Sequence, residues 1–511
     1  MKDSTQIMAN LVDLPDGWAS TTLDDFVLVN PPKPDVSTHP DDTVVTFVPM
    51  SAVSELNGSI VSPQERKLIE VKRGYTAFRE KDVLFAKITP CMENGKAAIA
   101  GKLSNGLGYG STEFHVLRPL CGVPPDFIHH FVRQPIFRDE ARRSMTGTAG
   151  QLRVPEGFVK RTPIAVPPLP EQHRIVEKLE KLLDRIRCAD ASIERVPVLL
   201  KQFRQAVLAA ACSGKLVEQD SDDEPASALL ERIRVERRKQ WEVNLIAKGK
   251  DPQNHSYIEP AEPNTVNLSE LPNGWTWTNF GMLAKVSSGY AFKAKEFSDI
   301  GVPVVRISNL IDERVEINGC VRIDPKYLQL ASQFVLKEGD VLIAMSGATT
   351  GKTAIFDLEE KVLLNQRVGK FFVTSDTNVS RRFLWYLIER IKSQIIEMAW
   401  GCAQPNISGS EIETIVIPLP PLPEQRRIIK RVNDLFNIAD TIEVEVVKAK
   451  VNSANIVQSI LAKAFRGELV EQDPRDEPAS KLLDMILARK DRKVGEKFAT
   501  TKRRPAKVGG P

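Results

Sequence analysis

The sequence predicts an α+β protein in which two similar globular domains are held apart by two long antiparallel coiled-coil helices, as a pseudo-twofold internal repeat. Two observations lead to this fold class. The segment that begins at Pro168 and ends at Ser213 recurs 253 positions later, beginning at Pro421, without insertion or deletion. The regions outside the two copies are far less alike, although they share short landmarks. Such a chain combines a preserved scaffold with two regions that vary.

The first domain is expected to cover residues 1–166. It opens with Leu14-Pro15-Asp16-Gly17-Trp18. Runs rich in β-branched residues predict strands at Val44–Val48 and Asp82–Ala86, and helical periodicity predicts one helix at Phe127–Arg143. The mixture of short strands and helices makes the domain α+β.

A first conserved helical spacer is expected over residues 167–247. Its main helix begins near Pro170, which suits the first turn, and ends before Gly214, which suits a left-handed cap. Pro197 lies inside this helix, so we expect a kink or a restart there. Apolar residues follow alternating steps of four and three, a 3.5-residue repeat that forms a seam to be buried against another helix. They are Ile175, Leu179, Leu182, Ile186, Ala189, Ile193, Val196, Leu200, Phe203, Val207 and Ala210.

A further helix is expected from Pro225 to about Asn244, followed by a polar linker over residues 248–268. The second domain is expected over residues 269–417 and opens with Leu271-Pro272-Asn273-Gly274-Trp275. Its Asp340-Val341-Leu342 matches Asp82-Val83-Leu84 of the first domain, so both domains derive from one plan. The predicted strands and helix are Val302–Ile307, Val341–Met345, Lys370–Val373 and Arg381–Met398.

A second conserved helical spacer is expected over residues 418–495. A helix from Pro423 to Arg466 would be roughly 66 Å long at 1.5 Å per residue. If the two long helices are antiparallel, the first delivers the chain to the end where the second domain begins, and this favours the antiparallel arrangement. The basic residues 496–511 are expected to form a disordered tail. The second copy of the seam is Ile428, Val432, Leu435, Ala439, Ile442, Val446, Ala449, Ser453, Ile456, Ile460 and Lys463.

Composition excludes several classes of function. The formal net charge of +4 permits nucleic-acid binding without requiring it. The six cysteines are scattered singly, and no Cys/His spacing suggests a zinc site or a disulfide framework. The sequence has neither a run of about 18 apolar residues nor an N-terminal signal pattern, so a cytoplasmic location without a membrane partner is expected.

No catalytic constellation is found. The segment Ser346–Thr353 resembles a phosphate-binding loop, but Ser346 stands where that motif needs glycine. Asn30-Pro31-Pro32-Lys33 lacks the aromatic residue of the adenine methyltransferase tetrad, and Glu65-Arg66-Lys67 is too short to indicate a nuclease. His129-His130 has no local Asp or Cys partner and is expected on a helix face.

Three sets of motifs recur in the same order in both halves of the chain. These are the domain openings Leu-Pro-x-Gly-Trp, the repeat starts Pro-Leu-Pro-Glu-Gln-x-x-Ile, and the repeat endings at 213–217 and 466–470. Together they resemble the specificity subunit of type I restriction–modification systems over nearly the whole chain. The resemblance implies two target-recognition domains, each of which reads one half of an asymmetric bipartite site in double-stranded DNA.

The same resemblance implies a protein assembly. The helical spacers would separate the two domains and dock two methyltransferase subunits, and restriction subunits would join through them. The chain itself would be non-catalytic and bind neither cofactor nor metal, while the partner subunits would use S-adenosylmethionine, ATP and Mg²⁺. Two alternatives stay open: a coiled-coil adaptor that does not bind DNA, and a DNA methyltransferase or nuclease in its own right.

DNA contacts are expected from polar side chains in the loops of the two domains, because Arg and Lys suit guanine, Asn and Gln suit adenine, and hydroxyls suit either. Each of these side chains could instead cap its own backbone in a turn. The candidates in the first domain are Lys87, Thr89, Asn94, Lys96, Gln151 and Arg153. Those in the second domain are Arg306, Ser308, Asn309, Ser346, Thr349, Thr350, Lys352, Gln404 and Asn406. The residues expected at the partner-docking and spacer surface are Glu171, Gln172, Arg174, Glu424, Gln425 and Arg427.

Overall fold

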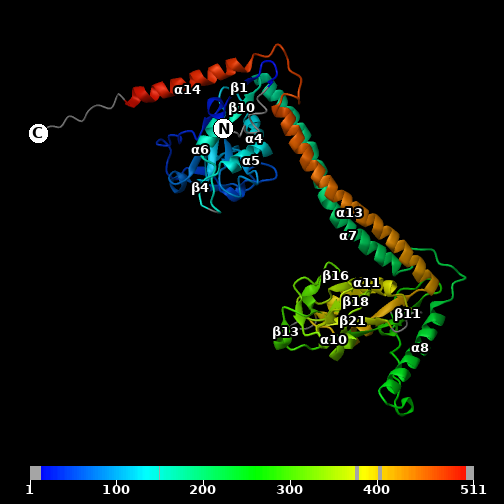
Figure 1. The fold of residues 1–511 in the computed structure, drawn as a ribbon. Coiled ribbons are helices and arrows are strands. Elements are labelled where there is room, and N and C mark those ends of the chain that lie inside the picture. The colour runs from blue at the N-terminus through cyan, green and yellow to red at the C-terminus, as the bar shows by residue number, and fades with distance from the viewer. Residues whose placement is uncertain (1–12, 149, 267, 374–378, 401–404, 502–511) are drawn as a thin grey trace. The chain divides into compact units, whose positions relative to one another are not determined.

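The computed structural model describes residues 13–148, 150–266, 268–373, 379–400 and 405–501, with side chains described up to residue 490. The chain divides into two compact units. Unit 1 comprises residues 1–194 and 447–511, and unit 2 comprises residues 195–446. Each unit holds one α+β domain together with one part of each long helix, α7 (Leu169–Ala211) and α13 (Leu422–Phe465) (Figure 1).

The domain of unit 1 is built on two four-stranded sheets. Their strand orders are β2-β9-β6-β7 and β4-β3-β8-β5, and a separate pair, β1 with β10, opens and closes the domain. Within the first sheet β6 and β9 are antiparallel, with Leu84 opposite Val116. The strands are β1 (Ala19–Thr22), β2 (Leu28–Val29), β3 (Val44–Val48), β4 (Gln64–Lys67), β5 (Thr76–Arg79), β6 (Val83–Ala86), β7 (Ala97–Ile99), β8 (Leu107–Gly110), β9 (Phe114–Arg118) and β10 (Pro163–Val166).

The helix predicted at Phe127–Arg143 is two helices, α4 (Pro125–Arg133) and α5 (Pro135–Arg143). The prediction of one helix was wrong because Pro135 has no N–H to donate and restricts Gln134, whose backbone leaves the helical region with ψ 136°. The smaller helices of this domain are α2 (Leu23–Phe26), α3 (Leu68–Val71) and α6 (Glu156–Arg161).

The domain of unit 2 has the same plan with different edges. Its sheets have the strand orders β12-β21-β18-β19-β16-β15 and β13-β17-β14-β20, and β11 pairs with β22 as β1 pairs with β10. The central pair, β18 and β21, corresponds to β6 and β9. The strands are β11 (Thr276–Asn279), β12 (Ala284–Ser288), β13 (Phe297–Ser298), β14 (Val302–Val305), β15 (Leu310–Ile311), β16 (Arg314–Val315), β17 (Val321–Ile323), β18 (Asp340–Ala344), β19 (Thr353–Phe356), β20 (Leu363–Leu364), β21 (Val368–Val373) and β22 (Val416–Leu419). The helices are α9 (Phe280–Leu283), α10 (Tyr327–Leu330), α11 (Arg381–Ala399) and α12 (Gly409–Glu413).

An ion pair with a buried aspartate links the two central strands in each domain. Asp82 binds Arg118 through two hydrogen bonds of 2.7 Å, and Asp340 pairs with Lys370. Each aspartate also accepts the backbone N–H three residues before it, from Arg79 in the first domain. The shared pair supports the common plan inferred from Asp82-Val83-Leu84 and its counterpart.

The long helices pair antiparallel within each unit. In unit 1 the start of α7, at Ile175 and Leu179, belongs to the same buried cluster as Leu461 near the end of α13. In unit 2 the end of α7, at Val207, shares a cluster with Ile428 near the start of α13. These contacts confirm the predicted antiparallel coiled coil (Figure 1).

The seam differs from the prediction at several positions. Ile456 is 50% exposed, Ile442 40% and Phe203 36%. Val457, next to Ile456, packs into the core of unit 1 instead. The strict four-and-three pattern fails here because a straight α-helix has 3.6 residues per turn, so a 3.5-residue pattern drifts from the buried face. Pro197 lies inside α7, which runs without a break from Leu169 to Ala211, so the helix does not restart there. A kink at this residue stays a prediction.

Each repeat ends in a second helix, α8 (Ala226–Ala247) or α14 (Ala479–Thr501). Arg237 of α8 donates to the carbonyl of Gly281 in α9, and Lys490 of α14 donates to that of Asp24 in α2. Helix α14 extends into the segment expected to be a tail, and residues 502–511 lie outside the described residues. Among the helices of the described chain, none is long and apolar enough to cross a lipid bilayer.

Candidate nucleic-acid interface

In the first domain, three segments that carry candidate residues are joined by backbone hydrogen bonds. The N–H of Thr89 donates to Leu152 over 3.0 Å, and that of Val154 donates to Lys87 over 2.8 Å. The N–H of Lys87 donates to Glu113, which directly precedes β9, over 2.9 Å. We call this arrangement the loop frame of the first domain. It places the loop after β6 beside the segment that follows α5.

The second domain repeats the same three bonds. The N–H of Gly347 donates to Pro405, that of Ile407 to Met345, and that of Met345 to Arg367, each over 3.0 Å. This is the loop frame of the second domain. Matching the bonds one by one places Arg367 at the position of Glu113, and Asn406 at the position of Arg153. The two frames therefore share a backbone arrangement and differ in the side chains that they carry.

Two candidates of the first frame project from its surface. Arg153 is held by Glu113, with Nε to Oε2 at 2.9 Å and Nη2 to Oε1 at 2.8 Å, and its side chain is 40% exposed. These hydrogen bonds from Arg153 hold the pKa of the Glu113 carboxyl below its usual value. Gln151 is exposed, and its carbonyl accepts from Nη1 of Arg153. Both residues are placed where a ligand can reach them.

Three of the other candidates of the first domain hydrogen-bond to neighbouring groups, and one of these bonds stays within the loop after β6. Thr89 Oγ1 donates to Glu93 over 2.9 Å, and Asn94 donates to a carboxylate oxygen of Glu55 over 3.1 Å. Lys96 Nζ donates to a backbone carbonyl over 3.3 Å, and Lys87 is half-buried. The exposed Asn94 stays accessible, whereas Thr89 and Lys96 would have to exchange partners to contact DNA.

In the second domain, two candidates are buried in turns. Asn309 is 6% exposed, accepts the N–H of Arg306 over 3.0 Å, and donates to the carbonyl of Glu316 over 3.2 Å. Thr350 is 7% exposed and donates to the carbonyl of Gly347 over 2.6 Å. These geometries favour the turn-capping role over a DNA contact for both residues.

The remaining candidates lie around the second frame. Ser308, Lys352 and Asn406 are exposed. In the part of the chain that the structure describes, Nε of Arg306 and the side-chain oxygens of Ser346 and Thr349 are buried without a hydrogen-bond partner. Gln404 lies outside the described residues. The two loops adjoin, since a Cβ atom at Gly347 would lie 3.4 Å from Ile307.

Three residues were not among the predicted candidates: Glu113 and Arg367 of the loop frames, and Trp400 beside the second frame. Glu113 and Arg367 each precede a central strand by one residue, and only the hydrogen bonds reveal that they are equivalent. Trp400 is 63% exposed and directly follows Ala399, whose carbonyl accepts from Asn406. An exposed tryptophan beside a candidate loop is a signal that sequence could have offered, because large aromatic side chains are usually buried.

Two motifs that resembled other sites have structural roles. Asn30 accepts the N–H of Val116 over 3.0 Å, so it ties the start of the proline-rich segment to β9. His129 bonds the carbonyl of Ala97, and Nε2 of His130 lies 2.8 Å from the Glu180 carboxylate of α7. The helix-face interpretation of the histidines is confirmed. Over the described residues, no group of three His, Cys, Asp or Glu side chains could hold a metal ion.

The joint between domain and long helix in unit 1 is a buried polar cluster. Glu171 is 1% exposed and accepts from Nε1 of Trp18 and from Nε2 of Gln472, both over 3.1 Å. One turn along α7, Arg174 pairs with Asp476 over 2.6 Å. Burial raises the pKa of the Glu171 carboxyl. We call this arrangement the clasp of unit 1; it ties the first repeat's helix to the second repeat's ending.

Unit 2 has an equivalent clasp with the repeats exchanged. Glu424 accepts from Trp275 over 2.9 Å and from Gln219 over 3.1 Å. Arg427 pairs with Asp223 over 2.6 Å. Burial again raises the pKa of the glutamate, Glu424. The reciprocal exchange gives the repeat its pseudo-twofold relationship.

All six residues expected at the docking surface belong to these joints. Four of them, Glu171, Gln172, Glu424 and Gln425, are at most 1% exposed, so contact with a partner would require breaking their internal bonds. The side chains of Arg174 and Arg427 are 37% exposed. A docking role for the set remains a prediction, and the two arginines are its accessible members.

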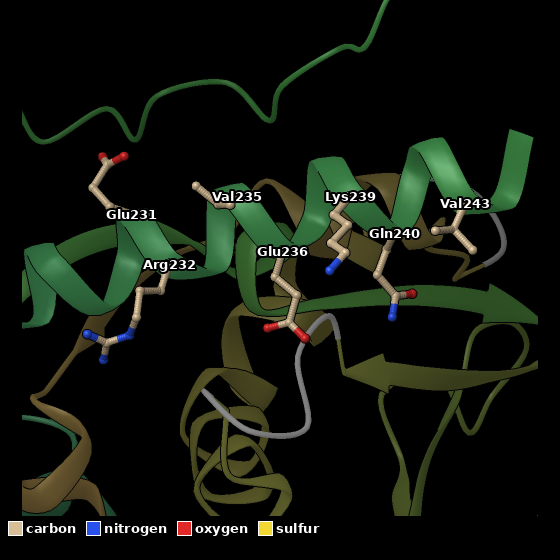
Figure 2. A pocket seen from close by; sticks show the side chains of 7 residues that line it. All are labelled: Glu231, Arg232, Val235, Glu236, Lys239, Gln240 and Val243. Atoms are coloured by element: carbon tan, nitrogen blue, oxygen red, sulfur yellow. The ribbon is translucent and has the colours of Figure 1, made fainter. Parts of the chain in front are cut away.

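A separate hollow of about 750 Å³ lies along α8 and contains none of the predicted DNA-binding residues. Figure 2 shows the side chains that line it. Their positions alternate in steps of one and three, so residues four apart follow one another along one side of the helix. They are Glu231, Arg232, Val235, Glu236, Lys239, Gln240 and Val243.

Comparison with known proteins agrees with the repeated architecture. A family model described as type I restriction modification DNA specificity domain matches residues 15–197 and again residues 272–451. The chain belongs to this family. As a specificity subunit with two DNA specificity domains, it is a non-catalytic, DNA-reading component, which confirms the function predicted from its motifs.

Individual relatives match along most of this specificity subunit. The EcoAI specificity subunit of Escherichia coli is 32% identical, with 89% of this chain and 83% of the relative covered. The EcoEI specificity subunit of Escherichia coli is 28% identical, over 89% and 82% respectively. The crystal structure of the HsdS subunit from Thermoanaerobacter tengcongensis has a TM-score of 0.58 and 23% identity, covering 89% of this chain and 98% of that one. The last similarity supports the fold.

Proposed function

We propose that each domain of this specificity subunit reads one half of an asymmetric bipartite site in double-stranded DNA. The observation that carries this proposal is the pair of loop frames, which share three backbone hydrogen bonds and present different side chains. Arg153 with Glu113 stands in one frame, and Asn406 with Arg367 stands in the other. A shared backbone places each reader alike against a duplex, and unlike side chains select unlike bases.

The scaffold would dock two methyltransferase subunits, and through them restriction subunits. The equivalent clasps support two equivalent docking surfaces, because repeated elements present the same patch twice. The long helices also expose apolar side chains, such as Leu199 at 57% and Ile438 at 54% in unit 2, and Val447 at 63% in unit 1. Exposed apolar side chains clustered on a helix are typical of protein interfaces. Arg174 and Arg427 would border these surfaces.

In this assembly the chemistry belongs to the partners. S-adenosylmethionine, ATP and Mg²⁺ would be used by the methyltransferase and restriction subunits, and this chain would bind none of them. The complex would act in the cytoplasm, where the DNA that it reads is found. We also propose target-recognition domains at 1–166 and 269–417, spacers at 167–247 and 418–495, and a linker at 248–268.

Methylation-aware sequencing tests the proposal. The chain is expressed with its methyltransferase subunit in a host without related systems, and the modified sites are collected. We expect a split motif whose two halves are unlike and separated by bases that are not read. Methylation that depends on one continuous motif, or on no motif, would overturn the proposal.

Two further assays address the alternatives. A gel-shift with duplex DNA, using the chain with its methyltransferase partner, would show no binding if the chain were only a coiled-coil adaptor. Incubating the chain alone with S-adenosylmethionine and DNA, and separately with Mg²⁺ and DNA, would show methylation or cleavage if the chain were itself an enzyme.

A further inference from the structure

The guanidinium of Arg153 is held in a defined orientation. Glu113 accepts from Nε over 2.9 Å and from Nη2 over 2.8 Å, and the carbonyl of Gln151 accepts from Nη1 over 3.0 Å. A guanidinium carries five N–H donors, so one donor remains on each terminal nitrogen. Two neighbouring donors match the O6 and N7 acceptors of guanine in the major groove.

The backbone of Arg153 is fixed as well. The residue bridges Ile88 on one side and Thr146 on the other, and its N–H donates to the carbonyl of Thr146 over 2.9 Å. Exposed ion pairs contribute only about 0–1 kcal/mol to stability, so folding alone is a weak reason for this arrangement. A side chain that is fixed before binding loses less conformational entropy when it meets its ligand.

The second frame presents a different set at the same two positions. Asn406 and Arg367 are exposed, and within the described chain their side chains make no hydrogen bond or ion pair. An asparagine side chain can pair with N6 and N7 of adenine. The carboxylate that holds the arginine of the first domain has no counterpart, because Arg367 stands in its place.

We propose that Arg153 reads a guanine in the first half-site, with Glu113 as its positioning residue, and that Asn406 at the matched position reads an adenine in the second half-site. This inference rests on the proposed function and adds the base that each frame selects. It also explains why the two frames carry unlike side chains on one backbone arrangement.

The test uses the chain assembled with its methyltransferase subunits, and binding selection from duplexes with randomised half-sites. Arg153→Lys keeps the charge and loses the paired donors. We expect the preference for guanine at one position of the first half-site to fall by about 5- to 150-fold, with the second half-site unchanged. Glu113→Gln should reduce the preference at that same position. Asn406→Ala should do the same for one adenine of the second half-site.

A control variant and the pattern of the Glu113→Gln result together separate positioning from structural support. Glu177→Gln breaks the exposed Glu177–Lys181 ion pair of unit 1, and it should leave every base preference unchanged. If Glu113 were only structural, Glu113→Gln would lower affinity for all sequences equally. That outcome would overturn its positioning role.

A transfer of the pair gives the sharpest result. The double variant Arg367→Glu with Asn406→Arg should replace the adenine preference of the second half-site with guanine. If the wild-type complex selects a bipartite site but Arg153→Lys and Asn406→Ala leave it intact, or if the affected positions are not guanine and adenine, the inference is wrong and the proposed function stands. If the wild-type complex selects no bipartite site, the proposed function itself fails. Should the double variant fail to fold, the single variants decide.

Discussion

At the scale of single residues, the clasps show how buried polar groups join a domain to a helix. Glu171 is withdrawn from water and depends on donors from Trp18 and Gln472. A buried carboxylate without such donors would keep the cost of desolvation with little compensation. The tryptophan of each domain opening is therefore a hydrogen-bond donor as well as an apolar side chain.

Trp18→Phe tests this role, because it removes the Nε1–H donor and keeps an aromatic ring. We expect the free energy of unfolding of unit 1 to fall by about 1–3 kcal/mol, measured by urea denaturation. The matched control is Trp277→Phe in unit 2. The indole N–H of Trp277 donates no hydrogen bond to a described residue. Equal losses in the two variants would contradict the role of the clasp.

The hydrogen bond between His130 and Glu180 predicts a dependence on pH. The hydrogen bond from His130 lowers the pKa of Glu180 from 4.5 to about 2. Because the folded-state pKa is below the unfolded value, the pair stabilises the protein above pH 4.5, and this contribution is lost as the pH falls from 4.5 towards 2. Glu180→Gln should therefore be less stable than wild type at pH 7, with a smaller difference at pH 3.5. Urea denaturation at both values measures this, and a constant difference would exclude the proposed linkage.

Sequence could supply the residues of the clasps but not their pairing. Trp18 and Glu171 belong to separate motifs of the sequence. Because 153 positions separate them, the sequence does not show that they form a hydrogen bond. Glu171 is expected at the partner-docking surface from the sequence, but it is 1% exposed. Only the fold, which brings in Gln472 from the other repeat, removes this carboxylate from the surface.

At the scale of elements, the helix ends are fixed by close approaches of the backbone. Gly214 follows α7 with φ +68°, and Gly467 follows α13 with φ +75°. A Cβ atom at Gly214 would lie 2.4 Å from Cγ of Pro272, and one at Gly467 would lie 2.5 Å from Cγ of Pro15. The predicted left-handed caps are confirmed, and the packing against the domain openings is a second reason for glycine.

Gly214→Ala should therefore destabilise unit 2 for two reasons, a left-handed backbone and a steric clash. Gly249→Ala is the matched control, because Gly249 has φ +70° and nothing within 4 Å of a Cβ atom. We expect Gly249→Ala to cost about 1–2 kcal/mol and Gly214→Ala to cost a further 1–3 kcal/mol or so, measured by urea denaturation. Equal costs would show that the approach of Pro272 is unimportant.

The long helices were the most predictable elements, because periodicity over many turns is a strong local signal. Helix α13 was expected at 423–466 and lies at 422–465. Prediction failed where one residue overrides a pattern, as at Pro135, and where the seam drifts, as at Ile456. The failure at Pro135 comes from the backbone restriction that proline imposes, and the one at Ile456 from the difference between 3.5 and 3.6 residues per turn.

At the scale of the whole molecule, two readers and one scaffold are combined in a single chain. The repeated scaffold could be predicted from its strict register. The loop frames could not, because Arg153 and Glu113 are 40 positions apart and belong to segments without shared motifs. The sequences of the two loop frames differ, so only their backbone hydrogen bonds show that the frames are equivalent.

If the helix pair sets the distance between the readers, its length should set the unread spacer of the DNA site. Inserting four residues next to Val446, with four more at the facing part of α7, adds about one turn or 6 Å. We expect the preferred spacer to lengthen and the bases of both half-sites to stay the same, as measured by methylation-aware sequencing. An unchanged spacer would show that the helices do not determine it.

Replacing one domain tests most directly whether two independent readers share one scaffold. Residues 19–161 are exchanged for the corresponding segment of another specificity subunit, with both joints kept, and the methylated sites of the resulting complex are sequenced. We expect one half-site to change while the other half-site stays intact. A change in both half-sites, or in neither, would contradict this expectation.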